Sequence, residues 1–306
     1  MCPMAYSVVE IESKDIWTWF ITLLKMDLNI TNGNEHEWTF INDRQKGLLP
    51  AIHEEVPRTE HRHYAMHLLS NFQKMFKGVS LEDKFWVCAK ASHVPMFEDA
   101  VEKMKAKSPE GYNYLAKEPP RYWSRSHFKD IVKCDMACNN LCEAFNKSIL
   151  EAREKPIIEM LEWIRCYFSN RMLIRREWIR KFTNELLPNC YSKLEEYLNE
   201  SALCEARWFG DLQFQVWCGE GEQYIVDLNQ RTCTCRKWDL NGIPCPHAIA
   251  AIQEKHDKVE WYISHWYSKT SYMNAYQPLV NPINGYNMWP KTGFTPVICP
   301  AQRRKQ

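Results

Sequence analysis

The sequence predicts an α/β region at its N-terminal end, a mostly helical middle and a small ββα unit near its C-terminal end. Strand-like and helix-like apolar runs alternate over the first 56 residues, which is typical of an α/β sheet. From about residue 67 the apolar residues recur at helical spacing. Three cysteines and one histidine then lie close together in residues 233–247, a pattern typical of a small metal-organised fold.

The first elements follow from the spacing of apolar residues. The run at 5–11 predicts a buried strand, and apolar residues at helical spacing between 17 and 28 predict a helix. A second strand is predicted over 38–42, and a second helix over 48–56. Prolines interrupt the helical stretch that follows, at Pro109, Pro119 and Pro120.

The ββα unit is predicted over residues 207–256. Two alternating apolar runs on either side of Gly219 and Gly221 predict a hairpin, and the run 248–252 predicts a short helix. The chain after the unit predicts a further helix around 259–266 and then an extended or disordered, proline-rich tail.

Four soft ligands lie in two tight pairs within this unit: Cys233, Cys235, Cys245 and His247. Thiolate and imidazole suit Zn²⁺, and four protein ligands complete a closed tetrahedral site. A single buried cysteine or histidine is most often a core residue, but four in this order favour a metal site. A unit of this size has little core of its own, so zinc would supply much of its folding energy.

Composition limits the function classes. Lys and Arg number 39 and Asp and Glu 38, which gives a net charge of +1, so any DNA contact must come from a local basic patch. The odd count of 13 cysteines, together with the lack of a leader-like segment, predicts a reducing intracellular compartment with mostly buried free thiols. No stretch is apolar for the ~20 residues that a membrane span needs.

The residues around the four ligands resemble a SWIM zinc finger, most closely the version found in Mutator-like (MULE) transposases and their domesticated relatives. The resemblance is carried by the run 224–228, the four ligands, Trp238, the run 242–248 and the run 250–252. It implies a structural zinc ion, contact with DNA or protein, and a nuclear location. Arg303, Arg304 and Lys305 near the C-terminus add to the nuclear expectation.

A resemblance to the MULE transposase domain covers most of the remaining chain. It is carried by the runs 5–10, 17–20 and 42–48, by His61, Arg62, His67, Asn71 and Phe72, and by Asn139, Asn140, Glu143, Phe145, Asn146, Arg153, Pro156, Ile157, Ile164 and Arg165. Such transposases resemble ribonuclease H in fold. Three of their carboxylates hold two Mg²⁺ ions, which activate the attacking oxygen and stabilise the leaving one.

Asp43 matches the second of those carboxylates and Glu143 the third, whereas the first has no counterpart. The resemblance therefore implies an N-terminally truncated chain that lacks the first two strands of the fold, and Tyr64 stands where the family has cysteine. An incomplete triad predicts a relict site, with Mg²⁺ only if transposase activity is retained. The alternative roles are a helix N-cap for Asp43 and a solvated helix residue for Glu143. Without the two strands, the runs at 5–11 and 38–42 should pair directly or stay poorly ordered.

These resemblances divide the chain into five regions. They are a partial ribonuclease H-like region at 1–66, a helical insertion at 67–140, a helical region completing the transposase-like domain at 141–200, the SWIM zinc finger at 207–256, and a helix with a basic tail at 257–306.

Three further clusters have two possible roles each. Six basic residues with interleaved aromatics could contact DNA phosphates or form a solvated helix face: Arg165, Arg171, Arg175, Arg176, Arg180 and Lys181. Cys134, Cys138 and Cys142 recur every four residues and favour a buried helix stripe over a soft-metal face. His61, His63 and His67 favour packing and surface roles over a shared ligand set.

The combined interpretation is a zinc-binding, non-catalytic protein derived from a MULE transposase. Two alternatives stay open. The first is an active DNA transposase whose missing carboxylate comes from upstream sequence or from another chain. The second is a protein-interaction adaptor that does not bind DNA.

Overall fold

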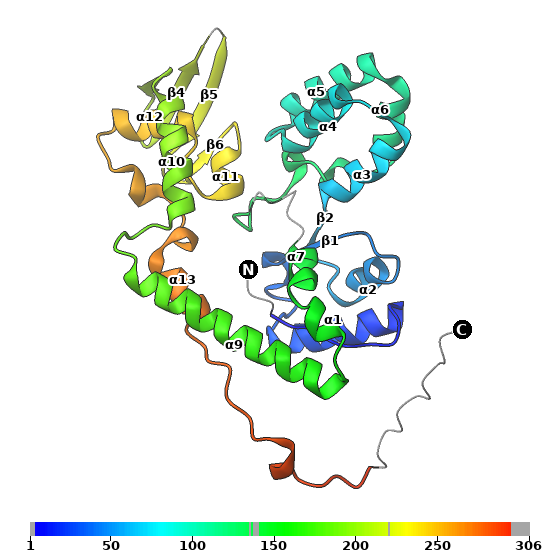
Figure 1. The fold of residues 1–306 in the computed structure, drawn as a ribbon. Helices are drawn as coiled ribbons and strands as arrows, with labels where there is room; N and C mark the ends of the chain where they lie inside the picture. Colours follow the sequence, from blue (N-terminus) through cyan, green and yellow to red (C-terminus); the bar gives the residue numbers. More distant parts are fainter. Residues whose placement is uncertain (1–3, 135, 137–140, 220, 295–306) are drawn as a thin grey trace.

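The computed structural model describes residues 4–134, 136, 141–219 and 221–294, and it is mostly helical with two small sheets (Figure 1). The N-terminal elements are α1 (Lys14–Asp27), η1 (Glu35–Glu37), β1 (Thr39–Asn42), α2 (Leu48–Glu55) and β2 (Glu60–His63). Helix α1 begins after Ser13, whose hydroxyl accepts a hydrogen bond from the Ile16 amide at 3.3 Å. Helices α1 and α2 pack together over Ile21 and Ile52. The bounds of β1, α1 and α2 confirm the predicted strand at 38–42 and both predicted helices.

The two N-terminal strands form one small parallel sheet. Strand β1 pairs with β2, with Thr39 opposite Glu60 and Asn42 opposite His63, and α2 connects them. Such a βαβ unit is the expected link between parallel strands. Within the described residues the sheet has these two strands alone, so the ribonuclease H-like architecture stays a prediction.

The predicted strand at residues 5–11 is wrong. Residues 4–10 have no regular secondary structure, and Val8 and Ile11 are exposed. A strand needs a neighbour to receive its hydrogen bonds, and β1 pairs with β2 instead. Direct pairing between the runs at 5–11 and 38–42 therefore does not occur.

The helical middle has its own aromatic core. Its elements are α3 (Ala65–Met75), α4 (Val79–Lys90), α5 (Val94–Lys107), α6 (Pro109–Leu115), η2 (Pro120–Tyr122) and η3 (Arg125–His127). Phe72, Phe85, Phe97 and Trp123 pack in its centre, with Phe85 stacked on Trp123 at 5.5 Å between ring centroids. The predicted helical stretch is thus a compact group of four helices.

A long helix leads to the C-terminal part. Helices α7 (Leu141–Ser148) and α8 (Leu150–Arg153) precede α9 (Ile157–Lys181), which runs diagonally below α10 and α1 in Figure 1. Helix α13 (Lys269–Tyr276) packs against α9. No helix in the part of the chain that the structure describes is long and apolar enough to cross a membrane.

A four-stranded antiparallel sheet and three helices build the C-terminal module. The elements are α10 (Pro188–Ser201), β3 (Cys204–Trp208), β4 (Gln213–Cys218), β5 (Glu222–Asp227), β6 (Thr232–Cys233), α11 (Lys237–Asn241) and α12 (Pro246–Glu254). The strands follow the order β3-β4-β5-β6, and α12 packs against them and against α10. The predicted hairpin and short helix are confirmed.

The region after the module differs from the predicted helix around 259–266. Two single turns, η4 (Val259–Tyr262) and η5 (His265–Tyr267), precede α13. Ser264 separates the turns because its amide bonds the Gly242 carbonyl at 2.8 Å instead of continuing a helix. Residues 277–294 contain η6 (Tyr286–Met288) and otherwise no regular structure.

The chain enters and leaves the C-terminal module at one point. Leu186 and Ser268 form an isolated antiparallel bridge. The Leu187 amide donates to the Tyr267 carbonyl at 2.9 Å, and the Lys269 amide donates to the Glu185 carbonyl at 2.8 Å. Residues 187–267 are therefore closed at their base by backbone hydrogen bonds.

Candidate metal centre

The structure brings the four predicted ligands into one buried cluster. The ligand atoms of Cys233, Cys235, Cys245 and His247 all lie within 4.8 Å of one another. All four residues are buried, from fully buried Cys245 to His247 at 8% exposure. The His247 ring turns Nδ1 to the sulfurs, 3.5 Å from Cys233 Sγ and 3.9 Å from Cys245 Sγ.

Local backbone geometry places the first pair of sulfurs. Cys233 ends β6, and the chain then turns through Arg236, whose φ of 61° is left-handed. The Arg236 amide donates to the Cys233 carbonyl at 2.7 Å, and the buried Asp239 carboxylate accepts from the Cys233 amide at 3.0 Å. These bonds hold Cys233 and Cys235 on one tight turn between β6 and α11.

The second pair lies at the start of α12. Cys245 is the N-cap of that helix, and its sulfur accepts from the Ala248 amide at 3.5 Å. Pro246 occupies the first turn, where its missing N–H costs nothing. A thiolate is stabilised at a helix N-terminus by the exposed amides and the helix dipole, so this position suits a metal-binding cysteine.

The donor set and its spacing fit Zn²⁺. A tetrahedral ion with Zn–S of about 2.3 Å and Zn–N of about 2.0 Å separates sulfur from nitrogen by about 3.5 Å, which agrees with the Cys233–His247 distance of 3.5 Å. Cys235 and His247 also line a cleft of about 730 Å³, which gives an ion a route to the cluster. Four protein ligands leave no open coordination position, so the arrangement suits a structural ion.

Burial and mutual hydrogen bonds shift the pKa values of the clustered thiols in opposite directions. Burial raises the pKa of the Cys245 thiol well above its ordinary value. Hydrogen bonds from Cys233 and Cys245 lower the pKa of Cys235. Three adjacent buried thiolates repel one another, so a divalent cation is needed to keep all three deprotonated.

An aromatic ring covers the histidine. Tyr224 of β5 stacks on His247, with 3.8 Å between ring centroids and 14° between planes. Tyr224 is brought there by the hairpin register, because Val216 of β4 lies opposite it. The stack fixes the orientation of the His247 ring.

The core around the cluster is larger than the predicted 207–256 unit. Cys190, Leu194 and Tyr197 of α10 are buried in the same apolar cluster as the three cysteine ligands. Their spacing, i, i+4 and i+7, is a helical signal that was present in the sequence. The module therefore buries more apolar surface than the sequence interpretation assumed, and zinc is not its sole source of stability.

A disulfide beside the cluster was not predicted. Cys204 of β3 and Cys218 of β4 are paired residues and form a disulfide. Their sulfurs lie within 4.8 Å of a ring nitrogen of His247. The expectation of free thiols is therefore wrong for this pair. Of the eight free cysteines among the described residues, five are buried, whereas Cys142 and Cys166 are exposed.

Comparisons with known families agree with this geometry. Residues 214–256 match the SWIM zinc finger and residues 1–71 match the MULE transposase domain. The C-terminal module thus contains a SWIM zinc finger. The SWIM match contains all four clustered ligands, and the MULE match contains Asp43. Comparison with curated proteins and with solved structures found no match.

Among the described residues, neither Asp43 nor Glu143 belongs to a group of three or more possible metal ligands. Asp43 is exposed just after β1, and its carboxylate accepts from the Gln45 amide at 3.3 Å. Glu143 is exposed on α7, with Oε1 3.7 Å from Nε2 of His67. Among the described residues, the groups of three or more possible metal ligands all lie in the SWIM module.

Asp43 does not cap the following helix, so that alternative is wrong. The first amides of α2 are bonded by the side chain of Gln45, whose Oε1 accepts from Gly47 at 2.7 Å and from Leu48 at 2.8 Å. A longer side chain two residues closer to the helix reaches these amides directly.

Several basic residues of α9 form ion pairs or hydrogen bonds within the chain. Arg165 binds Glu162 at 2.6 Å and the Asn281 carbonyl at 3.1 Å, and Arg180 binds Glu177 at 2.6 Å. Arg176 donates to the carbonyls of residues 276–278, which close the C-terminal end of α13. Arg175 and Lys181 form no ion pair within the described part of the chain.

The predicted cysteine stripe and the group of three histidines are the two remaining clusters. The predicted buried helix stripe of cysteines is wrong for its two described members, because Cys134 precedes α7 and Cys142 is exposed. The third member, Cys138, lies outside the described residues. His61 and His63 are buried on β2 and His67 is half-buried on α3. They form no shared ligand group among the residues that the structure describes.

Proposed function

We propose that Cys233, Cys235, Cys245 and His247 bind one structural Zn²⁺ ion that holds the SWIM module in its folded form. The observation that carries this proposal is the buried four-ligand cluster with its 3.5 Å sulfur–nitrogen spacing. Burying three thiols without a cation leaves charged or unsatisfied sulfur, whereas zinc neutralises two thiolate charges and directs all four ligands.

Metal analysis of the purified chain tests this assignment. We expect one zinc ion per chain, and Cys245→Ser should lose it because a hydroxyl is a far poorer zinc ligand than a thiolate. Cys166→Ser is the matched control, since Cys166 is exposed on α9 away from the cluster. A wild-type chain without stoichiometric zinc, or a Cys245→Ser chain that keeps it, rejects the proposal.

The protein is further proposed to be non-catalytic. Two carboxylates, Asp43 and Glu143, correspond to transposase ligands, and both are exposed rather than gathered around a cation site. Two Mg²⁺ ions in such an active site share a bridging carboxylate, and nothing within the described residues supplies it. The alternative, an active transposase, needs that carboxylate from upstream sequence or another chain.

Strand cleavage distinguishes these alternatives. With Mg²⁺ and a DNA duplex, a non-catalytic chain leaves the strands intact. Cleavage that depends on Mg²⁺ and disappears in both Asp43→Ala and Glu143→Ala would establish the transposase alternative instead.

The SWIM module and α9 are proposed to mediate contact with DNA in the nucleus. Arg175 and Lys181, which form no ion pair within the described region, offer positive charge to phosphates. DNA affinity should fall steeply with salt, and a double Arg175→Gln, Lys181→Gln change should flatten that slope by about two. The same double change at exposed Lys103 and Lys105 should not. Salt-independent or absent DNA binding would favour the protein-interaction adaptor.

A further inference from the structure

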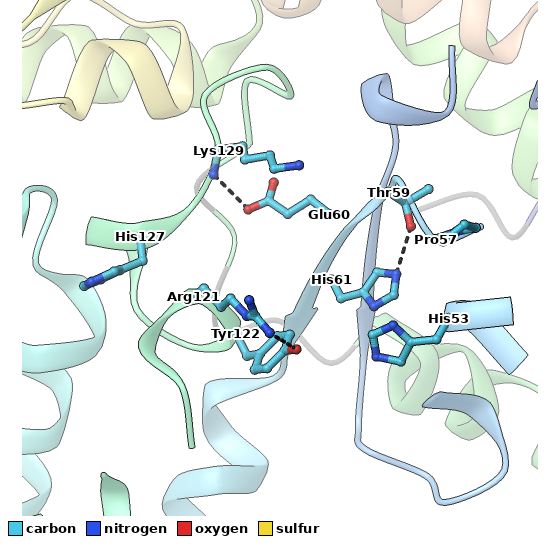
Figure 2. Close-up of a pocket in the computed structure, with 9 residues that line it drawn as sticks. All are labelled: His53, Pro57, Thr59, Glu60, His61, Arg121, Tyr122, His127 and Lys129. Carbon is cyan, nitrogen blue, oxygen red and sulfur yellow. Dashed lines mark hydrogen bonds between the residues drawn. The ribbon is translucent and has the colours of Figure 1, made fainter. Parts of the chain in front are cut away.

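A pocket outside the zinc cluster is lined by basic side chains and histidines. It encloses about 250 Å³ and is lined by α2, β2 and the segment 121–129. His53 and His61 lie on one side, and Arg121 and Lys129 on the other, as Figure 2 shows. A water molecule occupies about 30 Å³ of liquid, so the pocket accommodates a small polyatomic group.

The acidic residue in the pocket wall is already satisfied. Glu60 Oε1 accepts from the Lys129 amide at 2.9 Å. Its Oε2 accepts from Arg62 at 2.7 Å and from Thr39 at 3.3 Å. Arg62 is fully buried and neutralises the carboxylate. The charges of Arg121 and Lys129 are therefore not cancelled by Glu60, and the pocket favours an anion.

The hydrogen bonds of His61 fix its tautomer. The Thr59 hydroxyl donates its proton to the Val56 carbonyl at 2.7 Å, so at 2.9 Å it must accept from Nε2 of His61. A neutral ring protonated on Nε2 carries a lone pair on Nδ1. Burial, with His53, Lys129 and Arg121 nearby, lowers the pKa of His61 to about 4, so the ring is neutral at physiological pH.

This neutral ring adds an acceptor to a cationic pocket. Figure 2 shows His53 on the side of His61 opposite Thr59, with 4.6 Å between the two ring centroids. The hydrogen bond to Thr59 uses Nε2 of His61, and the Val56 carbonyl also favours an N–H on this ring; with Nε2 as the donor, Nδ1 is the acceptor atom of the ring. A ligand that satisfies both features carries negative charge together with a hydrogen-bond donor, such as an O–H group. Neither His53 nor His61 belongs to a metal-ligand group in the described chain, so the pair is not explained by a metal.

We propose that this pocket binds a singly protonated phosphate monoester, with its anionic oxygens on Arg121 and Lys129 and its P–OH donating to His61. A phosphate monoester loses its second proton near pH 6, so this form is abundant close to neutrality. A phosphodiester, such as the DNA backbone, has no P–OH to donate. Sulfate is a dianion without a proton at the same pH. The site therefore selects a terminal phosphate over an internal one.

Calorimetric titration of the full zinc-loaded chain at pH 6 tests the proposal. The probes are inorganic phosphate, methyl phosphate, dimethyl phosphate and sulfate. We expect the first two to bind at least tenfold more tightly than the last two, because a charge-assisted hydrogen bond is lost with each of the latter. Equal affinity for all four, or no binding of phosphate, overturns the proposal.

Two variants locate the binding. Arg121→Gln, an exposed change expected to leave the fold intact, should weaken methyl phosphate about tenfold or more, whereas exposed Lys107→Gln should have no effect. His61→Phe should lower phosphate affinity to the level of sulfate, with zinc content and circular dichroism confirming its fold. Unchanged phosphate binding in Arg121→Gln rejects the site.

The pH dependence gives an independent check. The singly protonated monoester falls from about half of the total at pH 6 to about one part in a hundred at pH 8, so affinity should drop more than tenfold between these values. Six further titratable or charged residues line the pocket around His61: His53, Glu60, Arg121, Tyr122, His127 and Lys129. The positive charges of Arg121 and Lys129 disfavour a protonated His61. Affinity that rises with pH would show that the dianion is preferred and would contradict the proposal.

Discussion

At the scale of single residues, burial and hydrogen bonding decide the charge of the β2 histidines. Burial lowers the pKa of both His61 and His63 to about 4. His63 lies 3.9 Å from a carboxylate oxygen of Glu118, but Arg44 already pairs with that carboxylate. His63 is therefore neutral at pH 7, and the contact with Glu118 is not an ion pair.

These two histidines make stability depend on pH. The unfolded chain binds protons at its histidines near pH 6.5, whereas the folded state resists them until about pH 4. Their contribution to the free energy of unfolding is fully present above pH 6.5 and is lost as the pH falls toward 4. Urea unfolding between pH 7 and 4 should show a midpoint that falls more steeply in wild type than in His63→Gln. Identical slopes would show that His63 does not contribute.

At the scale of elements, the short helix α11 joins the SWIM module to the helical middle. Arg236 donates to the carbonyls of Ser126 and Phe128, and Lys133 donates to the Asp239 carbonyl at 2.9 Å. The helix ends at Gly242, whose φ of 78° is left-handed. A Cβ on Gly242 would lie 2.7 Å from Cβ of Ser264, so the end of α11 requires glycine for two reasons.

Replacing Gly242 should therefore be costly. Gly242→Ala combines a left-handed backbone penalty of about 1–2 kcal/mol with a steric clash, and we expect a loss of about 2–4 kcal/mol in unfolding free energy. Gly221→Ala is the matched control, because its φ of 82° is similar but nothing lies within 4 Å of the added Cβ. Chemical denaturation measures both. Equal losses would mean that the contact with Ser264 relaxes freely.

At the scale of the whole molecule, separate apolar cores divide the chain. The zinc ligands share a core with α10, while the aromatic core of α3–α5 is distinct and receives Leu240 from α11. Loss of zinc should thus destabilise the module and the contact that α11 makes with the helical middle, and it should leave the N-terminal half folded.

Hydrogen exchange with and without a chelator tests this division. Removing zinc should speed exchange of amides in 232–252 and in the contacting segment 126–133, because the ligand turns lose their fixed geometry. Amides of α3, which belongs to the separate aromatic core, should stay protected. Uniform loss of protection across the chain would show instead that zinc supports the entire fold.

The sequence predicted features that depend on near neighbours. The four ligands, the hairpin and α12 lie within about 40 residues of one another, and turn residues and apolar alternation determine them locally. The strand predicted at 5–11 failed because strand formation depends on a partner that local pattern does not reveal. The role of α10 and the pocket between His61 and Arg121 depend on packing between segments far apart in sequence.

The bridge between Leu186 and Ser268 gives the SWIM module adjacent ends. A folded unit whose two ends lie side by side can be inserted into an existing loop without stretching either flank. Residues 187–267 therefore have the geometry of a domain that can be inserted into a loop of another protein. Genetic rearrangement could place such a segment within another host protein, and the host fold would need to accommodate only a single point of attachment.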